Sequence, residues 1–370
     1  MIGRSIGRDY CASNFSRWVN TDATRLDRAL GARGAARGLQ RAHDSDRGRR
    51  TQRRRRRPER DCQPTRYHRH CLRQLPEARG YTLADYTAKW SAFTLGEMAV
   101  QDTRRFDNHT FSISATPFRT GKDSSVLDHA KYTALSKQAF AVPEIGSVTG
   151  SIEIGAETPG TILGHVVHGT YVQSGAPYAA RVLQGQQAAA TFHMIDFATG
   201  QLFDWFVSGN TAFTLYERLP SSVSGSAEHV GIDKMFTQII DEVPIAAGVP
   251  HTVAIRYSRE RHRSLVEYFL DGKRVSQVDH VGIPLDAQGV RYSGIYPSLG
   301  PGELLRDKIN SVTIAHGLFS LLDAFPFQHP EAPALNVSVP LKERLFGQGA
   351  RARFAHVVVT IEDKTNRADR

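Results

Sequence analysis

The stretch that decides the fold is Leu265-Val-Glu-Tyr-Phe-Leu-Asp-Gly-Lys-Arg-Val-Ser-Gln-Val278. It carries β-branched and aromatic residues before Asp271-Gly272, and valines among polar residues after it. This dipeptide is the strongest short signal for a β-hairpin, because both central positions of a type I′ turn need positive φ. The two-residue turn is expected to pair Leu270 with Lys273, Phe269 with Arg274 and Tyr268 with Val275. The alternating stretch at residues 253–257 is expected to add a third strand.

Short alternating segments of this kind recur from Tyr81 onward, separated by Gly, Pro, Asn, Asp and Ser. Few stretches offer helical periodicity of useful length, and a helical turn or two is expected at Leu318–Asp323 or near Leu341–Leu345. Many short strands without an internal repeat predict an all-β domain, a two-sheet antiparallel β-sandwich of the jelly-roll kind. The expected strands are Thr110–Ala115, Gly150–Ile154, Ala189–Phe197, Leu202–Val207, Thr211–Arg218, Met235–Ile240, Thr252–Ser258, Leu265–Leu270, Arg274–Val278, Ser311–Ala315 and His356–Glu362.

Residues 1–80 differ in composition from the domain at 81–370. They hold 21 Arg, no Lys and 8 acidic residues, whereas the rest holds 26 basic and 29 acidic residues. The formal charge of +10 therefore belongs to the leader, and the domain is mildly acidic. An arginine-rich segment without apolar periodicity is expected to be disordered, because it cannot bury enough surface to offset its chain entropy.

Three further interpretations of the leader stay open. Arg without Lys is typical of a different coding frame or a misplaced start in a GC-rich gene. An arginine arm would bind nucleic acid only non-specifically, through phosphate. A zinc site is weakly suggested by two cysteines and two histidines whose spacing fits no common ligand pattern, namely Cys62, His68, His70 and Cys71.

Composition also limits where the protein acts. The three cysteines, Cys11, Cys62 and Cys71, all lie in the leader, so no disulfide framework and no thiol nucleophile are expected in the domain. A membrane-spanning helix needs about 18 consecutive apolar residues, and the sequence contains no such run. The N-terminus lacks the apolar core of a secretory signal, which favours a cytoplasmic location.

A second hairpin is expected from Phe203–Val207 and Thr211–Arg218, joined by Ser-Gly-Asn. Pairing of Val207 with Thr211 sets Trp205 opposite Phe213 and Phe203 opposite Leu215 on one apolar face. A slip of one residue would move every side chain to the other face. In the expected register, the other face carries Asp204, Phe206, Ala212, Thr214, Tyr216 and Arg218.

Several stretches of the domain resemble the concanavalin A-like lectin/glucanase superfamily, and an uncharacterised bacterial family within it. The Asp-Gly hairpin after Ile255-Arg-Tyr is similar to the late hairpin of those sandwiches. The resemblance covers about Tyr81 to Asp363 and implies the fold. For function it implies little, because the superfamily includes lectins, glycoside hydrolases, lyases and interaction modules. The other stretches are His129-Ala-Lys-Tyr-Thr-Ala-Leu-Ser136, Phe203-Asp-Trp-Phe-Val207, Leu215-Tyr-Glu-Arg-Leu-Pro220 and Arg291-Tyr-Ser-Gly-Ile-Tyr296.

The best candidate ligand-binding residues are Asp204, Tyr216 and Arg218. Tyr and Arg can stack on a sugar or hydrogen-bond to it, with Asp204 as acceptor or base. The alternative is a solvated cross-strand ion pair that contributes under about 1 kcal/mol. Tyr292 and Tyr296, in a Gly/Pro-rich region, are candidates for one wall of a cleft, or else they close the end of the core.

Catalytic residues are harder to assign. Glu217 falls on the apolar face, either as a buried carboxylate with a raised pKa or as a strand-end residue in water. The glucanase pattern Glu-x-Asp-x-x-Glu does not occur, and Glu153-Ile-Gly-Ala-Glu157 lacks its middle Asp. His193 and Asp196 face opposite ways on one strand, so a His–Asp pair within that segment is not expected. No motif indicates a cofactor or a metal.

These observations support three hypotheses. The first is a binding protein for a carbohydrate or small metabolite, with a cleft on a concave sheet face. The second is an enzyme that acts on a sugar or small metabolite in that cleft, with Asp204 or Glu217 as acid or base. The third is a structural or self-associating domain. The ligand and the oligomeric state stay open at this point.

Overall fold

The computed structural model describes residues 82–92, 102–107, 110–116, 118, 130–221, 230–289, 300–322 and 333–365. All of them lie in the unit Tyr67–Arg370. The leader, with its expected disorder and its weak zinc pattern, lies outside the described residues. No helix in the described ranges is both long and apolar enough to cross a membrane.

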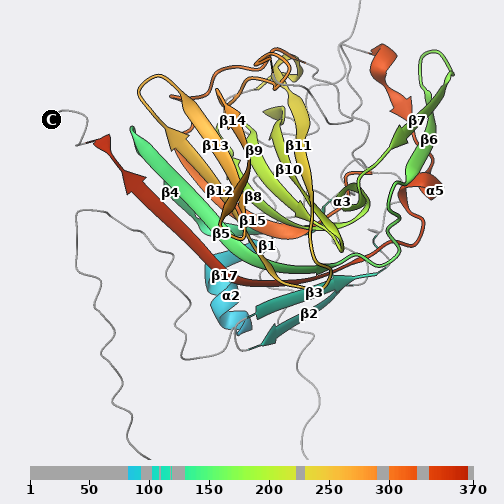
Figure 1. The fold of residues 1–370 in the computed structure, drawn as a ribbon, viewed down its shortest axis with the longest axis horizontal. Coiled ribbons are helices and arrows are strands. Elements are labelled where there is room, and N and C mark those ends of the chain that lie inside the picture. The colour runs from blue at the N-terminus through green and yellow to red at the C-terminus, as the bar shows by residue number, and fades with distance from the viewer. Residues whose placement is uncertain are drawn as a thin grey trace, which may run out of the picture. The chain divides into compact units, whose positions relative to one another are not determined.

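Two seven-stranded antiparallel sheets form the domain (Figure 1). The two-sheet sandwich predicted from the sequence is therefore confirmed. In spatial order, sheet A contains β1 (Trp90–Ala92), β4 (Ala130–Ala141), β15 (Ser311–Phe319), β8 (Ala189–Asp196), β9 (Gln201–Val207), β10 (Thr211–Arg218) and β11 (Phe236–Pro244). Sheet B contains β14 (Lys273–Asp279), β13 (Ser264–Leu270), β12 (His251–Arg259), β5 (Gly146–Glu157), β17 (Ala350–Asp363), β3 (Thr110–Ala115) and β2 (Asp102–Asp107).

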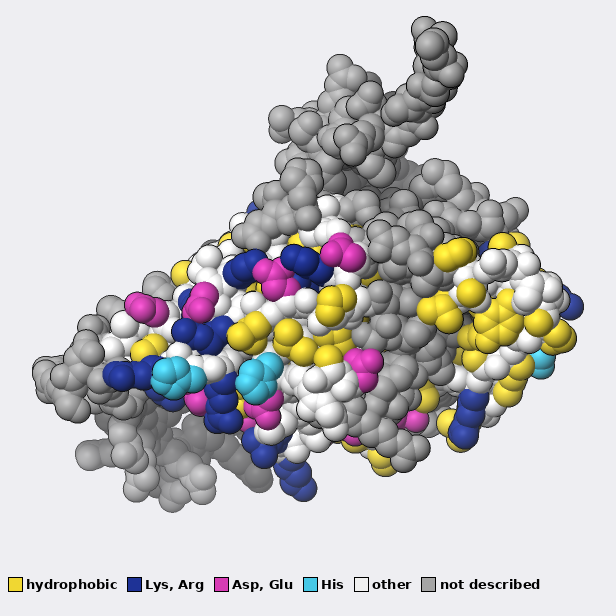
Figure 2. Space-filling view, turned by 90° about the horizontal axis from the view of Figure 1, so that it is seen from above, with side chains coloured by type: hydrophobic (Ala, Val, Ile, Leu, Met, Phe, Trp, Pro, Cys, Tyr) yellow, Lys and Arg dark blue, Asp and Glu magenta, His cyan; other side chains and the backbone are white. Residues whose placement is uncertain are grey.

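Smaller elements complete the described fold. A three-stranded sheet contains, in spatial order, β16 (Val337–Ser338), β6 (Val166–Tyr171) and β7 (Pro177–Arg181). Several apolar side chains around this sheet stay exposed, including Val172 at 58%. Figure 2 shows a group of exposed apolar side chains on one face of the molecule. The short helices are α2 (Leu83–Lys89), α3 (Gln184–Gln187), α5 (Leu341–Arg344) and the 3₁₀ turns η3 (Ile232–Lys234) and η4 (Pro333–Leu335).

The main core lies between the inner faces of sheets A and B. Period-2 alternation points Phe203 and Trp205 of β9 inward, where they meet Tyr257 and Tyr268 of sheet B at ring-centroid distances of 6.0 and 6.2 Å. The Trp205 indole N–H also donates to the carbonyl oxygen of Ala254 across the sandwich, at 3.1 Å. Aromatic contacts and hydrogen bonds thus join the two sheets directly.

A second apolar cluster covers part of the outer face of sheet A. It contains Phe206 and Phe213, whose rings stack at 4.8 Å, together with Val167 of β6 and Leu321. A Cβ atom placed on Gly185 of α3 would lie 2.8 Å from the Phe213 ring, so α3 lies directly against this face. The outer face of sheet A is therefore closed over at this end.

Nine of the eleven predicted strands coincide with strands of the structure or form part of longer ones. The other two are off by one residue, because β8 ends at Asp196 and β11 begins at Phe236. The turn at Leu341–Arg344 is confirmed as α5, but the alternative at Leu318–Asp323 is wrong at its start, because Leu318 and Phe319 continue β15. In the Asp271-Gly272 hairpin, the pairs Leu270–Lys273 and Phe269–Arg274 are confirmed. Tyr268 pairs with Ser276 rather than Val275, because a bulge adds one residue.

Candidate functional site

A tight turn between β8 and β9 sets the register of the candidate site. Asp196 accepts hydrogen bonds from the Ala198 amide at 3.1 Å and from the Thr199 hydroxyl at 2.6 Å. Gly200 takes φ +72°, a conformation that glycine adopts without a Cβ penalty. The turn pairs Asp196 with Gln201, so residues equally far before and after it lie opposite each other.

His193 and Asp204 form a buried cross-strand pair in this register. The Nδ1 atom of His193 lies 2.7 Å from Oδ1 of Asp204, and Nε2 lies 2.7 Å from the Thr191 hydroxyl. The imidazole ring also contacts the rings of Phe206 and Phe319, with centroids 6.2 and 4.7 Å away. His193 is 3% exposed and Asp204 is 1% exposed, so the pair is shielded from bulk water.

Glu217 on β10 extends this pair across the sheet. Asp204 lies opposite Leu215, two residues before Glu217, so the two carboxyl groups are diagonal neighbours on the outer face. They are hydrogen-bonded to each other. The Thr237 hydroxyl of β11 donates to Oε2 of Glu217 at 2.9 Å. We call this set the polar row, and it consists of Thr191, His193, Asp204, Glu217 and Thr237.

Burial shifts the pKa of each ionisable group in the polar row toward its neutral form. Burial, reinforced by the nearby Asp204, raises the pKa of Glu217 to about 8. Burial also raises the pKa of Asp204 well above its ordinary value. For His193, burial outweighs the nearby Glu217 and lowers the pKa to about 4. Glu217 and His193 are therefore neutral near pH 7, and Asp204 holds its proton more tightly than an ordinary aspartate does.

When its ionisable groups are neutral, each member of the polar row can donate a hydrogen bond to the next, from Thr237 to Thr191. Thr237 donates to Glu217, protonated Glu217 donates to Asp204, protonated Asp204 donates to Nδ1 of His193, and the Nε2–H of His193 donates to Thr191. No charge is then left buried without a counter-charge, which would be costly. The row is a continuous chain of exchangeable protons.

The Glu217 end of the polar row is the end nearest to solvent. Glu217 keeps 8% exposure against 1% for Asp204, and Leu202, directly opposite Glu217 on β9, is half-buried. A ligand or a water molecule would therefore meet Glu217 before the other ionisable groups. The structure thus places Glu217 as a buried carboxyl group with a raised pKa, the first of the two alternatives left open by the sequence.

The expected cluster of Asp204, Tyr216 and Arg218 is not formed. Val207 pairs with Ala212 rather than Thr211, and this slip of one residue puts Asp204 on the outer face and Tyr216 on the inner face. Tyr216 is fully buried in the main core, where its hydroxyl accepts a hydrogen bond from the Gly282 amide.

Contacts from distant segments explain the slip. The turn between β9 and β10 contains one residue more than expected, with the Ser208 amide donating to the Thr211 carbonyl at 2.8 Å. Gln184 of α3 accepts from the Asn210 amide at 3.1 Å, and Thr158 accepts from the Gly209 amide at 2.9 Å. These partners stabilise the longer turn, and the register of β10 follows from it.

Two other expectations have different outcomes. Tyr292 and Tyr296 lie outside the described residues, so their place in a cleft wall stays a prediction. His193 and Asp196 do not pair with each other, but the sequence analysis missed that His193 pairs with Asp204 on the next strand. The signal for it was the Asp-x-x-Thr-Gly turn at residues 196–200. This turn pairs Asp196 with Gln201, so the residue three before Asp196 lies opposite the residue three after Gln201. Within the described ranges, no three His, Cys, Asp or Glu side chains are grouped as metal ligands would be.

The protein is therefore a two-sheet β-sandwich that carries a buried row of Glu, Asp and His side chains on the outer face of sheet A. The chain belongs to the Family of unknown function DUF6081, whose model matches residues 100–363. A comparison with curated proteins found no match.

The solved structures to which the chain is similar include a glucanase, an alginate lyase and a lectin-like domain. An endo-1,3-beta-glucanase from Streptomyces sioyaensis is 9% identical, over 75% of this chain and 90% of that one, with a TM-score of 0.38. An exolytic alginate lyase from Zobellia galactanivorans is 9% identical, over 74% and 95%, with a TM-score of 0.37. A legume lectin-like domain from Entamoeba histolytica is 6% identical, over 76% and 92%, with a TM-score of 0.33. Likenesses this distant say nothing about activity.

Proposed function

We propose that the protein is an enzyme that transfers a proton to or from a small polar ligand at Glu217. The observation that carries the proposal is a carboxyl group with a pKa of about 8 that is hydrogen-bonded to a second carboxyl group and stands at the more exposed end of the polar row. A general acid works best when its pKa is close to the operating pH, and burial is the usual means of raising a glutamate to that range.

In this proposal Glu217 is the general acid. When it gives its proton to a ligand oxygen, the Thr237 hydroxyl, which donates to Oε2 at 2.9 Å, stabilises the carboxylate that remains. His193 holds Asp204 through Nδ1 at 2.7 Å, and Thr191 fixes the other ring nitrogen. Glu217 can take a proton back at the end of the cycle, because its pKa is close to neutral.

The polar row does not fit the usual arrangement of a two-carboxylate glycosidase. Those enzymes place carboxyl groups about 5–5.5 Å apart, or wider, on either side of the bond that is cut. Asp204 and Glu217 are hydrogen-bonded to each other, so they act as one proton-sharing unit on one side of a ligand. The proposal is therefore proton transfer by a carboxyl pair.

The lectin-like hypothesis from the sequence is the second candidate. A carbohydrate-binding groove is expected to be shallow, open and lined with exposed aromatic rings. Here Phe206 and Phe213 are at most 1% exposed, and α3 lies against them. This closure favours proton transfer over open binding. Carbohydrate is still the first ligand class to test, because the sequence resembles lectins and glucanases.

The test compares wild-type protein with Glu217→Gln on a panel of neutral and acidic oligosaccharides, with binding followed by saturation-transfer NMR and products by one-dimensional NMR. Gln keeps the shape and the neutral hydrogen bonds of protonated Glu but cannot release a proton. We expect turnover to fall about 10²–10⁴-fold while binding is retained. Glu157→Gln, whose side chain is 60% exposed, is the matched control and keeps full activity.

Two results would count against the proposal. Equal turnover by wild-type protein and Glu217→Gln would remove Glu217 from the chemistry. Binding without any turnover by the wild-type protein would support the lectin-like hypothesis.

A further inference from the structure

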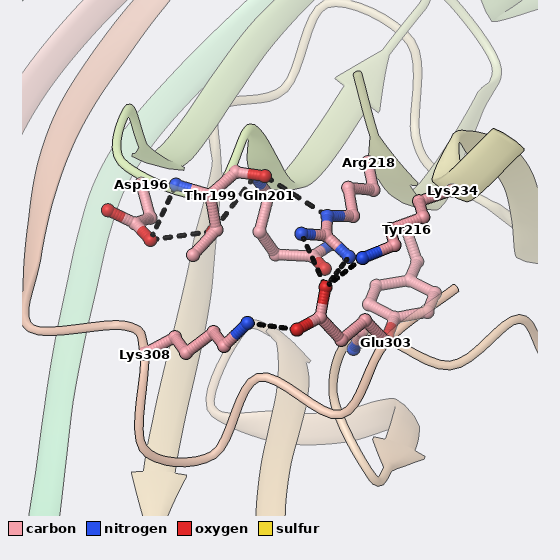
Figure 3. A network of polar contacts seen from close by, with 9 residues as sticks. Asp196, Thr199, Gln201, Tyr216, Arg218, Lys234, Glu303 and Lys308 are labelled. Atoms are coloured by element: carbon pink, nitrogen blue, oxygen red, sulfur yellow. Dashed lines mark hydrogen bonds and ion pairs between the residues drawn. The ribbon is translucent and has the colours of Figure 1, made fainter. Parts of the chain in front are cut away.

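A second polar cluster lies on the other side of sheet A from the polar row, where β10 ends. Arg218 points to the inner face, whereas its neighbour Glu217 points to the outer face. The Arg218 guanidinium binds Oε2 of Glu303 at 3.4 Å, and its Nε donates to the carbonyl oxygen of Thr199 at 3.1 Å. Figure 3 shows Glu303 between Arg218 and two lysines, which approach it from different segments of the chain.

The two lysines occupy both oxygens of the Glu303 carboxylate. The Lys234 ammonium, from η3, donates to Oε2 at 3.0 Å, and the Lys308 ammonium donates to Oε1. Three cationic side chains therefore share one carboxylate, which leaves a formal charge of +2 on the cluster. These three cations, with burial opposing them, lower the pKa of Glu303 to about 2, so the carboxylate is charged throughout the physiological range.

Two acidic groups in these segments have partners of their own. The Asp196 carboxylate accepts from the Thr199 hydroxyl at 2.6 Å, within its own turn. Asp307 pairs with Arg306 at 3.0 Å and is 73% exposed.

The cluster has a rigid base and an exposed rim. The Arg218 side chain is 2% exposed, whereas those of Lys234 and Lys308 are 42% and 45% exposed. The Glu303 amide donates to the carbonyl oxygen of Gly282 at 2.7 Å. A Cβ atom on Gly282, at φ +99°, would lie 1.9 Å from the Glu303 carbonyl oxygen, so the two segments are in close contact.

From this geometry we infer a binding site for a small oxyanion, a carboxylate or sulfate group, at the rim formed by Lys234 and Lys308. Each ammonium carries three donors and uses one of them on Glu303 in the bonds described, and both are held a short distance apart by that single carboxylate. An anion with several oxygens can accept from both ammonium groups at once, and each ammonium carries a positive charge at the exposed rim. Arg218 is a positioning residue that keeps Glu303 in place.

This inference does not depend on the proton-transfer proposal, because the two clusters lie on opposite faces of sheet A. It identifies a class of ligand, namely small molecules that carry a carboxylate or sulfate group. Glucuronate and glucose are suitable paired probes, because they have the same ring and differ by the carboxylate. Inorganic sulfate tests whether the anionic group is sufficient without a sugar.

The experiment titrates full-length protein with glucuronate, glucose and sodium sulfate by isothermal calorimetry at constant ionic strength. The test variant is the double substitution Lys234→Gln and Lys308→Gln. The matched control is Lys273→Gln and Lys342→Gln, which removes two exposed lysines elsewhere in the described chain. We expect the test variant to bind glucuronate about tenfold or more weakly than wild-type, and the control variant to bind it equally well.

The outcomes separate clearly. Binding of glucuronate but not glucose, lost only in the test variant, supports the site, and binding of sulfate as well shows that the anionic group is sufficient. Equal affinity for glucose and glucuronate overturns the inference, as does no binding of either anion. Equal loss in both double variants would indicate non-specific charge attraction and would also overturn it. If the test variant does not fold, Lys308→Gln alone, at a half-exposed position, gives the same comparison. Loss of turnover in Glu217→Gln has no bearing on these results.

Discussion

The most informative perturbation is Glu217→Gln, examined as the pH dependence of stability. The pKa of Glu217 is about 8 in the folded protein, against 4.5 for an unperturbed glutamate. The folded protein therefore holds a proton that the unfolded chain has already released. Stability must then fall as the pH rises between these two values, by about 1.4 kcal/mol per pH unit.

Buried histidines act in the opposite sense at lower pH. Burial lowers the pKa of His193 to about 4 and that of His316 to about 3, from ordinary values of 6.5. Below pH 6.5 the unfolded chain binds protons at these sites that the folded protein does not bind, so stability falls as the pH falls. Between pH 6.5 and 8 the histidines lose their remaining protons in the unfolded chain, and they do so equally in wild type and Glu217→Gln. The difference between the two proteins therefore reports on Glu217.

In that window we expect the wild-type protein to lose roughly 2 kcal/mol of unfolding free energy relative to Glu217→Gln. Gln can still donate to Asp204 and accept from Thr237, but it does not titrate. Urea unfolding of the full chain at several pH values in the window measures the difference. Glu157→Gln, at a 60% exposed side chain, is the control and should parallel the wild type. Parallel curves for wild type and Glu217→Gln would refute the assignment of a raised pKa.

Three further predictions concern the fold. Gly282→Ala places a Cβ atom 1.9 Å from a carbonyl oxygen and should lower the unfolding free energy by roughly 3 kcal/mol or more. The control is Gly248→Ala, at φ +71° with no atom within 4 Å, which should lower the unfolding free energy by about 1 kcal/mol. Similar urea midpoints for the two variants would contradict this. Arg218→Met should destabilise by roughly 2–3 kcal/mol, because the buried Thr199 carbonyl loses a donor and Glu303 loses a cation, and an unchanged midpoint would argue against these contacts. Residues 81–370 alone should unfold cooperatively in calorimetry at the same temperature as the full chain, and failure to fold would show that the leader contributes to stability.

Strand positions in this protein are largely readable from local sequence. Alternating apolar side chains and turn residues located β3 and β10 to the residue, because a strand with one buried face needs period 2 wherever it lies. The sequence analysis did not predict the strands β1, β2, β6, β7 and β16, nor the long strand β4, Ala130–Ala141. The four Ala and two Lys residues of β4 belong to types that are depleted in strands. Pairing with β1 and β15 inside sheet A outweighs that preference.

The predicted residue pairs were accurate where a turn is stabilised by its own residues, and wrong where distant segments hold the turn. Asp271-Gly272 stabilises its turn with positive φ at both positions, and its first two residue pairs were predicted correctly. The turn after Val207 is held by Gln184 and Thr158, which are remote in the sequence. A prediction from local residues therefore chose a register that differs by one from the observed pairing with Ala212.

The sequence by itself determined that the domain is an all-β sandwich and singled out Asp204 and Glu217 as candidate acid–base groups. Only the tertiary structure decided that these two carboxyl groups share a face, that His193 completes their chain, and that Arg218 meets Glu303 from a segment far along the chain. The physical reason is that alternation is a local property of each strand, whereas register and cross-chain ion pairs depend on contacts between segments that are brought together only by folding.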